Sequence, residues 1–258
     1  MNSPRRHKIG MYLLPSAFTI GNMMLGFYAM ILGFRGVTGG APEEFRKAAL
    51  MIFAAGILDT LDGRIARLTG TDSEFGKEYD SLADVLTFGV APALLVYFWG
   101  LRDFGRAGWL IPLFFVVCAA TRLARFNVQT KVVDSRFFVG LPVPAAAGTL
   151  CSVLFLAPQP EWRPYLSLVH AIGLVLVGSL MVSTFRYPSF KRVDLRKGRS
   201  YRTVLPLAAV ILVAAIEPYA FFLAAAISYT LAGPLGWLVG RFRPRPVGAP
   251  ELKEPASD

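Results

Sequence analysis

Long apolar runs, separated by short polar or charged segments, cover nearly the whole chain. Continuous runs of about 18 residues or more predict transmembrane helices, whereas the strands of a membrane β-barrel alternate apolar and polar positions. We predict eight spans, at roughly residues 12–34, 45–68, 80–100, 108–126, 139–157, 165–185, 203–216 and 219–240. The seventh run is short and is joined to the eighth through Glu217 and Pro218. The pattern therefore predicts an all-α, polytopic membrane protein.

The composition agrees with this fold class. The 258 residues are 54% apolar and 17% charged, with a mean hydropathy of +0.50, whereas a soluble domain carries about a quarter charged residues. Basic residues before the first run would also fit a cleaved signal peptide. That run, however, contains Asn22 and lacks a small-x-small cleavage pattern, so we predict a retained helix. Cys118 and Cys151 fall inside predicted spans, so neither a disulfide framework nor a zinc site is expected.

The positive charges predict the orientation. If each span reverses the side of the chain, 21 of the 27 Lys and Arg residues fall on the side of the N-terminus. Because short basic loops stay in the cytoplasm, this asymmetry predicts that both termini are cytoplasmic and that the protein lies in the cytoplasmic membrane. Topology then accounts for the net charge of +10, and no nucleic-acid partner is expected. The densest basic segment, residues 186–202, is expected to anchor the topology and could also attract anionic lipid headgroups.

Four aspartates lie at helical spacings at the ends of the second and third apolar runs. Asp59 and Asp62 are three residues apart and share one helix face. Asp80 and Asp84 are four apart and share another, and the polar linker 69–75 would form a turn that brings both pairs to the same depth. Ionised groups at that depth are costly and usually face an interior cavity and a partner. Four converging carboxylates suit two Mg²⁺ or Mn²⁺ ions about 3.5–4 Å apart, which predicts a metal-dependent enzyme site.

Small residues accompany these carboxylates. Gly63 directly follows the first pair, Ala66 lies about a turn further on, and Gly76 lies one turn before the second pair. They would leave a hollow in which a flat ring or a phosphate group could approach the backbone. Arg67 would close the helix at the cytoplasmic boundary, and Glu78 is expected to be a solvated charge. An ion-coupled transporter could also use intramembrane aspartates, but it has no need of this hollow, and the chain shows no inverted repeat.

Residues 59–84 read D-x-x-D-G-x-x-A-R-x8-G-x-x-x-D-x-x-x-D, which resembles the signature of the CDP-alcohol phosphotransferases. Further stretches resemble one group within that family, the CDP-diacylglycerol–serine O-phosphatidyltransferases or phosphatidylserine synthases. These stretches are residues 14–27, 80–93, 122–127 and 138–148. The charge and apolar patterns predict a basic cytoplasmic N-terminus (1–11), a basic loop with two additional transmembrane helices (191–240), and a cytoplasmic tail that we expect to be disordered (241–258). For residues 12–190 the resemblance implies a six-helix catalytic core. It also implies a homodimer.

The resemblance further implies roles for the motif residues. Asp59 and Asp80 would each bind both metal ions. Asp62 would bind one ion and Asp84 the other, and Asp84 would also be the general base. The residues that would hold the cytidine and pyrophosphate of CDP-diacylglycerol are Asn22, Gly63, Ala66, Arg67, Ser73 and Gly76.

The implied reaction transfers the phosphatidyl group of CDP-diacylglycerol to the hydroxyl of L-serine, giving phosphatidylserine and CMP by metal-assisted direct attack. Arginine can grip a carboxylate with two parallel hydrogen bonds. We therefore expect Arg122, Arg125 and Asn127, at the cytoplasmic end of the fourth span, to bind serine. Another acceptor on the same scaffold, such as glycerol 3-phosphate, an inositol phosphate or an archaeal-lipid substrate, remains an alternative. His7 and His170 have no neighbouring ligand residues and are not assigned to the site.

Overall fold

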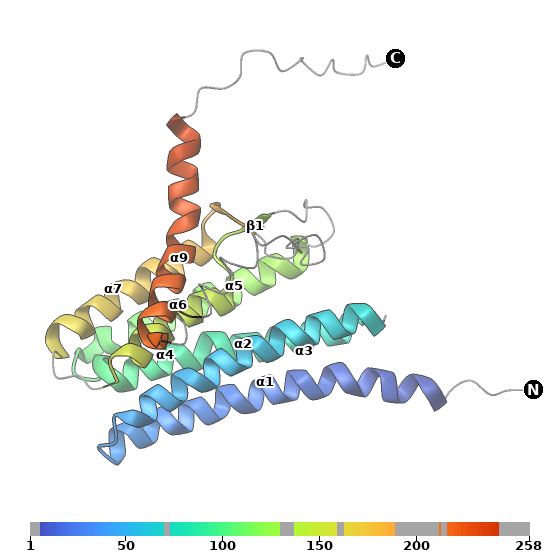
Figure 1. Cartoon of the computed structure of the whole chain (residues 1–258), viewed down its shortest axis with the longest axis horizontal. Coiled ribbons are helices and arrows are strands. Elements are labelled where there is room, and N and C mark those ends of the chain that lie inside the picture. Colours follow the sequence, from blue (N-terminus) through green and yellow to red (C-terminus); the bar gives the residue numbers. More distant parts are fainter. Residues whose placement is uncertain are drawn as a thin grey trace, which may run out of the picture.

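The computed structural model describes residues 6–69, 73–129, 137–158, 163–188, 212 and 216–242. Side chains at the ends of several segments, including those of residues 6–16 and 66–69, lie outside this description. The described chain is a bundle of helices with one small two-stranded sheet (Figure 1). The all-α fold class predicted from the apolar runs is therefore confirmed.

The first two helices form a long antiparallel hairpin. α1 (Arg6–Thr38) and α2 (Glu43–Thr69) lie side by side along much of their length (Figure 1). Gly40 supplies the left-handed backbone of the turn between them, with φ of 59°, which costs other residues more. Near the same end, the ring of Phe45 lies against Gly36, where an added Cβ would come within 2.8 Å of it. Small residues of this kind let two helix backbones approach closely in a membrane protein.

The third apolar run folds as one continuous helical span, Glu74–Leu101. Its four consecutive parts are α3 (Glu74–Asp84), the π-helical η1 (Val85–Val90), α4 (Ala91–Val96) and the π-helical η2 (Tyr97–Leu101). The wider π turns occur frequently at functional sites, and the first of them begins directly after Asp84. There the hydroxyl of Thr87 donates a hydrogen bond to the main-chain oxygen of Asn22 on α1, at 3.1 Å. This bond fixes the register between α1 and the third span beside the aspartates.

Three further helices complete the bundle: α5 (Gly105–Gln129), α6 (Val143–Leu156) and α7 (Arg163–Val182). α5 packs against α7, and α6 packs against α2. Two three-residue strands, β1 (Phe137–Val139) and β2 (Arg186–Pro188), pair antiparallel. They join the segment after α5 to the segment after α7.

The apolar run that predicted a fifth span at residues 139–157 contains two different elements, so that prediction is wrong at its start. Val139 ends β1, and Pro142 is the residue from which α6 begins. Proline suits this position because its missing N–H is not needed there. α6 has 14 residues, whereas crossing a membrane takes about 20. The run is therefore corrected to a short strand followed by a short, largely buried helix.

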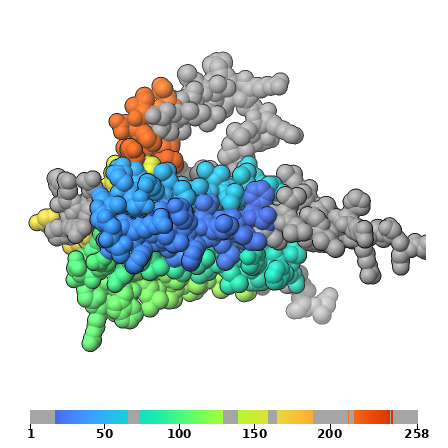
Figure 2. Space-filling view, turned by 90° about the horizontal axis from the view of Figure 1, so that it is seen from below, coloured from blue at the N-terminus to red at the C-terminus, as the bar shows by residue number. Residues whose placement is uncertain are grey.

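The last described helix, α9 (Pro218–Phe242), runs across the direction of α1 and α2, and its far part projects beyond the other helices (Figure 1). In Figure 2 its orange residues protrude from the rest of the molecule. Only 11% of the most apolar stretch within Pro218–Val239 is buried inside the protein, so most of the helix surface is available to lipid. Its first turns dock on α2 and α6 through aromatic rings. Phe222 stacks on Phe53 with ring centroids 5.0 Å apart, and Tyr219 lies 4.8 Å from Phe155.

Five helices are long and apolar enough to cross a membrane, namely Ala17–Thr38, Glu74–Leu101, Gly105–Val128, Tyr165–Val182 and Pro218–Val239. The chain is therefore an integral membrane protein. α2 is also long, with 27 residues, but charged residues at both of its ends lower its hydropathy. The predicted seventh span (203–216), most of the basic segment 186–202 and residues 243–258 of the tail lie outside the described residues. The seventh span consequently stays a prediction, and the predicted total of eight is not confirmed, because α6 is shorter than a full span.

Candidate active site

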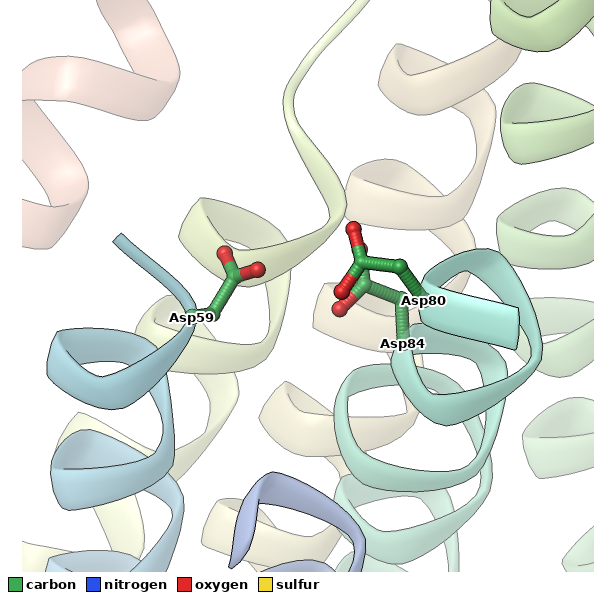
Figure 3. Close-up of side chains that lie close together, drawn as sticks. All are labelled: Asp59, Asp80 and Asp84. Atoms are coloured by element: carbon green, nitrogen blue, oxygen red, sulfur yellow. The ribbon is translucent and has the colours of Figure 1, made fainter. Parts of the chain in front are cut away.

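Three of the four predicted metal ligands meet at one point between two helices. Asp59 comes from α2, and Asp80 and Asp84 come from α3 (Figure 3). One carboxylate oxygen of each lies within 4.8 Å of the other two. Asp84 is buried, while Asp59 and Asp80 are half-buried. In Figure 3 the Asp59 carboxylate faces the other two across the space between the helices. The hairpin expected from the sequence therefore brings these acidic groups together.

Asp62 lies about one turn further along α2 and faces α1. Its Oδ2 accepts a hydrogen bond from the hydroxyl of Thr19 at 2.7 Å, and its Oδ1 is buried without a hydrogen-bond partner among the described residues. Asp62 is also close enough to Asp59 and Asp80 to repel both. The sequence analysis missed Thr19. The signal that could have found it is its position one turn before Asn22, on the same face of α1.

Asn22 adds a buried amide to the same space. Its side chain is 1% exposed and lies beside Asp84. Neither its amide oxygen nor its amide nitrogen makes a well-formed hydrogen bond within the described part of the chain. Buried amide groups without partners are costly and uncommon. Asn22 therefore retains bonding capacity beside Asp84, and its assignment to the donor pocket stays a prediction.

The chemistry of these residues fits a divalent cation. Carboxylate oxygens are the ligands that Mg²⁺ and Mn²⁺ prefer. Oδ1 of Asp84, like that of Asp62, is buried with no well-formed hydrogen bond among the described residues, and a buried carboxylate oxygen without a partner is costly. A cation between Asp59, Asp80 and Asp84 would relieve the repulsion among them. The acidic group could therefore bind a divalent metal ion.

The small residues beside the aspartates differ in their surroundings. A Cβ added at Gly63 would meet nothing within 4 Å, so α2 is open at this point. Gly76 is engaged instead, because its N–H donates to the hydroxyl oxygen of Ser73 at 2.9 Å and so caps the start of α3. Ala66 and Arg67 belong to α2, but their side chains lie outside the described residues. The backbone at Gly63 is thus exposed and unobstructed, and the hollow beside the aspartates stays a prediction. Ser73 caps α3, and its predicted role in binding the donor also stays a prediction.

Arg122, the first of the predicted acceptor residues, is a buried cation on α5. It is 8% exposed and close enough to Asp84 for the two charges to attract each other. Its guanidinium carbon lies 5.7 Å from the ring centroid of Phe126. Its Nε is buried without a hydrogen-bond partner in the described chain. A buried guanidinium whose Nε lacks a hydrogen-bond partner is suited to bind an anionic group.

The other two predicted acceptor residues already bond to protein atoms. Nη1 of Arg125 makes a long contact, 3.5 Å, with the main-chain oxygen of Val182. The amide nitrogen of Asn127 donates to the Ser81 hydroxyl at 2.9 Å and to the Glu78 carboxylate at 3.3 Å. The Asn127 bonds join the end of α5 to α3, and the Arg125 contact joins it to the end of α7. Glu78 is exposed, as expected, but it is hydrogen-bonded rather than merely solvated.

Among the described residues, no histidine or cysteine joins the acidic group. Cys118 and Cys151 are free and buried, in agreement with the expectation of no disulfide. His170 is buried, and its ring meets Trp99 edge-on with centroids 4.7 Å apart. The side chain of His7 lies outside the described residues.

Comparison with known proteins identifies the family of the chain. The family model of the CDP-alcohol phosphatidyltransferases matches residues 12–185. The chain is 39% identical over 235 residues to a protein of Helicobacter pylori named CDP-diacylglycerol–serine O-phosphatidyltransferase, covering 88% of this chain and 92% of that protein. A protein of the same name from Bacillus subtilis is 33% identical over 182 residues, covering 70% of this chain and 93% of that protein. Another, from Methanocaldococcus jannaschii, is 38% identical over 141 residues, covering 54% and 63%.

The residues matched by the family model include the whole aspartate motif and the buried Arg122. The family match and the named relatives indicate the same family, and the converging carboxylates of α2 and α3 fit its aspartate motif. The chain belongs to the CDP-alcohol phosphatidyltransferase family.

Proposed function

We propose that the protein transfers the phosphatidyl group of CDP-diacylglycerol to the hydroxyl of L-serine and releases CMP. The observation that carries this proposal is the meeting of Asp59, Asp80 and Asp84, with oxygens within 4.8 Å of one another, next to buried Arg122. The names of the relatives from Helicobacter pylori and Bacillus subtilis, each aligned over more than nine-tenths of its length, support serine as the acceptor.

Direct attack would need no covalent enzyme intermediate. The serine hydroxyl oxygen forms a bond to the phosphorus that carries the diacylglycerol. The bond from that phosphorus to the CMP oxygen breaks, and its electron pair leaves with CMP. Asp84 is the proposed base that accepts the hydroxyl proton, because a neutral hydroxyl is a weak nucleophile. Its position at the junction of α3 and the π-helical η1, deep between helices, supports this role.

Mg²⁺ or Mn²⁺ is the proposed cofactor, and we infer two ions. The proposed ligands are Asp59, Asp62, Asp80 and Asp84. The repulsion among these carboxylates and the buried, unpartnered Oδ1 atoms of Asp62 and Asp84 support the assignment. When bound, the ions would offset the charge of the pyrophosphate and stabilise the leaving CMP. Thr19 would hold Asp62 in a fixed orientation for this purpose.

The donor nucleotide is proposed to lie along α1–α3, with its acyl chains remaining in lipid. The open backbone at Gly63 and the buried amide of Asn22 support this position. The remaining residues proposed for this pocket are Ala66, Arg67, Ser73 and Gly76. In the proposed orientation the site faces the cytoplasm from the cytoplasmic membrane, and both termini are cytoplasmic. A homodimer is proposed on the basis of the family resemblance alone.

The serine carboxylate is proposed to bind Arg122, because a guanidinium can make two parallel hydrogen bonds to a carboxylate. The nearness of Arg122 to Asp84 would bring the serine hydroxyl close to its base. Arg125 and Asn127 are weaker candidates, since both already contact protein oxygens.

The test uses the purified full chain in detergent micelles with CDP-diacylglycerol and Mg²⁺ or Mn²⁺. CMP release is measured with L-serine, with glycerol 3-phosphate, with an inositol phosphate and with no acceptor, and each reaction is repeated with excess chelator. The proposal predicts release that requires serine and stops with the chelator. Release with glycerol 3-phosphate or the inositol phosphate but not with serine would reject serine as the acceptor. Failure of every acceptor, with an archaeal-type donor lipid included, would reject the transferase itself and revive the ion-coupled transporter.

A further inference from the structure

Asn127, near the end of α5, is bonded to two side chains of α3. Its amide nitrogen donates to the hydroxyl oxygen of Ser81 at 2.9 Å and to Oε2 of Glu78 at 3.3 Å. The Ser81 hydroxyl also lies 3.3 Å from the amide oxygen of Asn127, and it donates to the main-chain oxygen of Lys77 at 3.0 Å. Glu78 and Ser81 are three residues apart and share one face of α3. One amide therefore ties two points of α3, about a turn apart, to α5.

These bonds act where α3 is least packed. Residues 74–78, at the start of α3, are exposed, whereas the buried residues of the helix are Ala83 and Asp84 at its other end. Segments with few buried contacts open most easily. Asp80 lies between the two ends and is half-buried. Packing thus fixes the deep end of α3, and the bonds to Asn127 fix the half of the helix in which packing is sparse.

α3 carries two of the candidate metal ligands beside this attachment. Asp80 directly precedes Ser81 in the chain and lies on a neighbouring face of the helix. Its carboxylate and that of Asp84 face Asp59 of α2 (Figure 3). A rotation of α3 about its axis would carry Asp80 away from Asp59, and it would also pull Ser81 away from α5. The bonds of Asn127 therefore oppose a movement that would separate the carboxylates, and metal affinity depends on groups that hold the ligands in orientation.

We propose that Asn127 is a positioning residue of the metal site, and that it acts by fixing α3 to α5 through Ser81. This inference rests on the proposed function, in which carboxylates of α2 and α3 bind divalent ions. An asparagine amide has two N–H groups, and for Asn127 two acceptors stand on α3, the oxygens of Ser81 and Glu78. Asn127 thus serves the metal ligands rather than the carboxylate of serine. Loss of its amide weakens metal binding and leaves KM for serine at saturating metal unchanged.

The test measures Mn²⁺ binding by electron paramagnetic resonance on the full chain in nanodiscs without substrates, and then KM for serine at saturating Mn²⁺. Asn127→Ala removes the amide, and Val128→Ala, at a neighbour that is 79% exposed, is its control. Ser81→Ala removes the partner hydroxyl, and Ser81→Thr keeps it. Ser179→Ala is the matched control for Ser81→Ala, because the Ser179 hydroxyl also donates to the main-chain oxygen four residues earlier, that of Val175, at 2.7 Å.

Asn127→Ala and Ser81→Ala are each expected to weaken Mn²⁺ binding about fivefold, the effect of losing one hydrogen bond. Ser81→Thr and the two controls should bind Mn²⁺ like the wild type, and KM for serine should stay unchanged throughout. Unchanged Mn²⁺ binding in Asn127→Ala overturns the proposal: a lower melting temperature alone would then indicate a merely structural role, and a higher KM for serine would place Asn127 in the acceptor pocket. A loss in Asn127→Ala that Ser81→Ala does not share also overturns it, because the effect would not pass through Ser81.

The binding measurement needs no acceptor. It therefore decides the role of Asn127 even if the wild type releases CMP with an acceptor other than serine, in which case only the serine assignment fails. Absence of Mn²⁺ binding by the wild type would reject the proposed metal site and the role of Asn127 with it.

Discussion

The hydroxyl of Thr19 donates a hydrogen bond to Oδ2 of Asp62, with 2.7 Å between the two oxygens. The bond joins α1 to α2 inside the bundle, beside the converging carboxylates of α2 and α3. α1 therefore does more than enclose the site. It orients one acidic side chain through Thr19 and contributes the buried amide of Asn22.

Thr19→Val keeps the shape of the side chain and removes this hydrogen bond. We expect the concentration of Mn²⁺ that gives half-maximal CMP release to rise about tenfold, because groups that orient metal ligands contribute about 10- to 100-fold in affinity. The matched control is Thr38→Val, since the Thr38 hydroxyl donates to the main-chain oxygen of Phe34 at the exposed end of α1, away from the aspartates. Equal metal requirements in the two variants would show that the Thr19 bond does not serve the site.

Asp84→Asn tests the proposed base. An amide of the same size cannot accept the serine proton, so we expect turnover to fall by about 100-fold or more. Binding of CDP-diacylglycerol, measured separately on the purified variant, should be retained. Asp103→Asn is the control, because Asp103 lies exposed in the turn after η2. Turnover of Asp84→Asn at the rate of the control would remove Asp84 as the base.

Gly63→Leu tests the hollow beside the aspartates. The open space at Gly63 lets the variant fold, and leucine is a good helix former. The new side chain would occupy the proposed nucleotide position and should raise KM for CDP-diacylglycerol about tenfold, with KM for serine unchanged. Gly173→Leu on α7 is the matched control, since a Cβ there also meets nothing within 4 Å. A donor KM that rises equally in both variants would argue against nucleotide binding at Gly63.

The fold class and the meeting of the aspartates could be predicted because both follow from local rules. Apolar runs determine which segments are helical in a membrane. Spacings of three and four residues determine which side chains share a helix face, and a short linker makes the two helices neighbours. The proximity of Asp59 and Asp80 could therefore be predicted from the sequence pattern alone.

The remaining features depend on contacts between distant segments, which no local pattern shows. The Thr19–Asp62 bond requires the register of α1 against α2. The three-residue strands β1 and β2 are too short to produce a periodic signal, so the apolar run at 139–157 read as one helix. The hydrogen bond from the Tyr229 hydroxyl to the main-chain oxygen of Pro188 depends on the direction in which α9 crosses the bundle. The hydropathy of the chain does not predict that direction.

The most direct test of the central claim, that carboxylates of α2 and α3 jointly hold a divalent cation, is Mn²⁺ binding followed by electron paramagnetic resonance. The wild type, Asp80→Asn and Asp103→Asn are compared in nanodiscs without substrates. We expect the wild type and Asp103→Asn to bind Mn²⁺ equally, and Asp80→Asn to bind it at least about tenfold more weakly. Equal Mn²⁺ binding by Asp80→Asn and the wild type, or no binding by the wild type, would contradict the account.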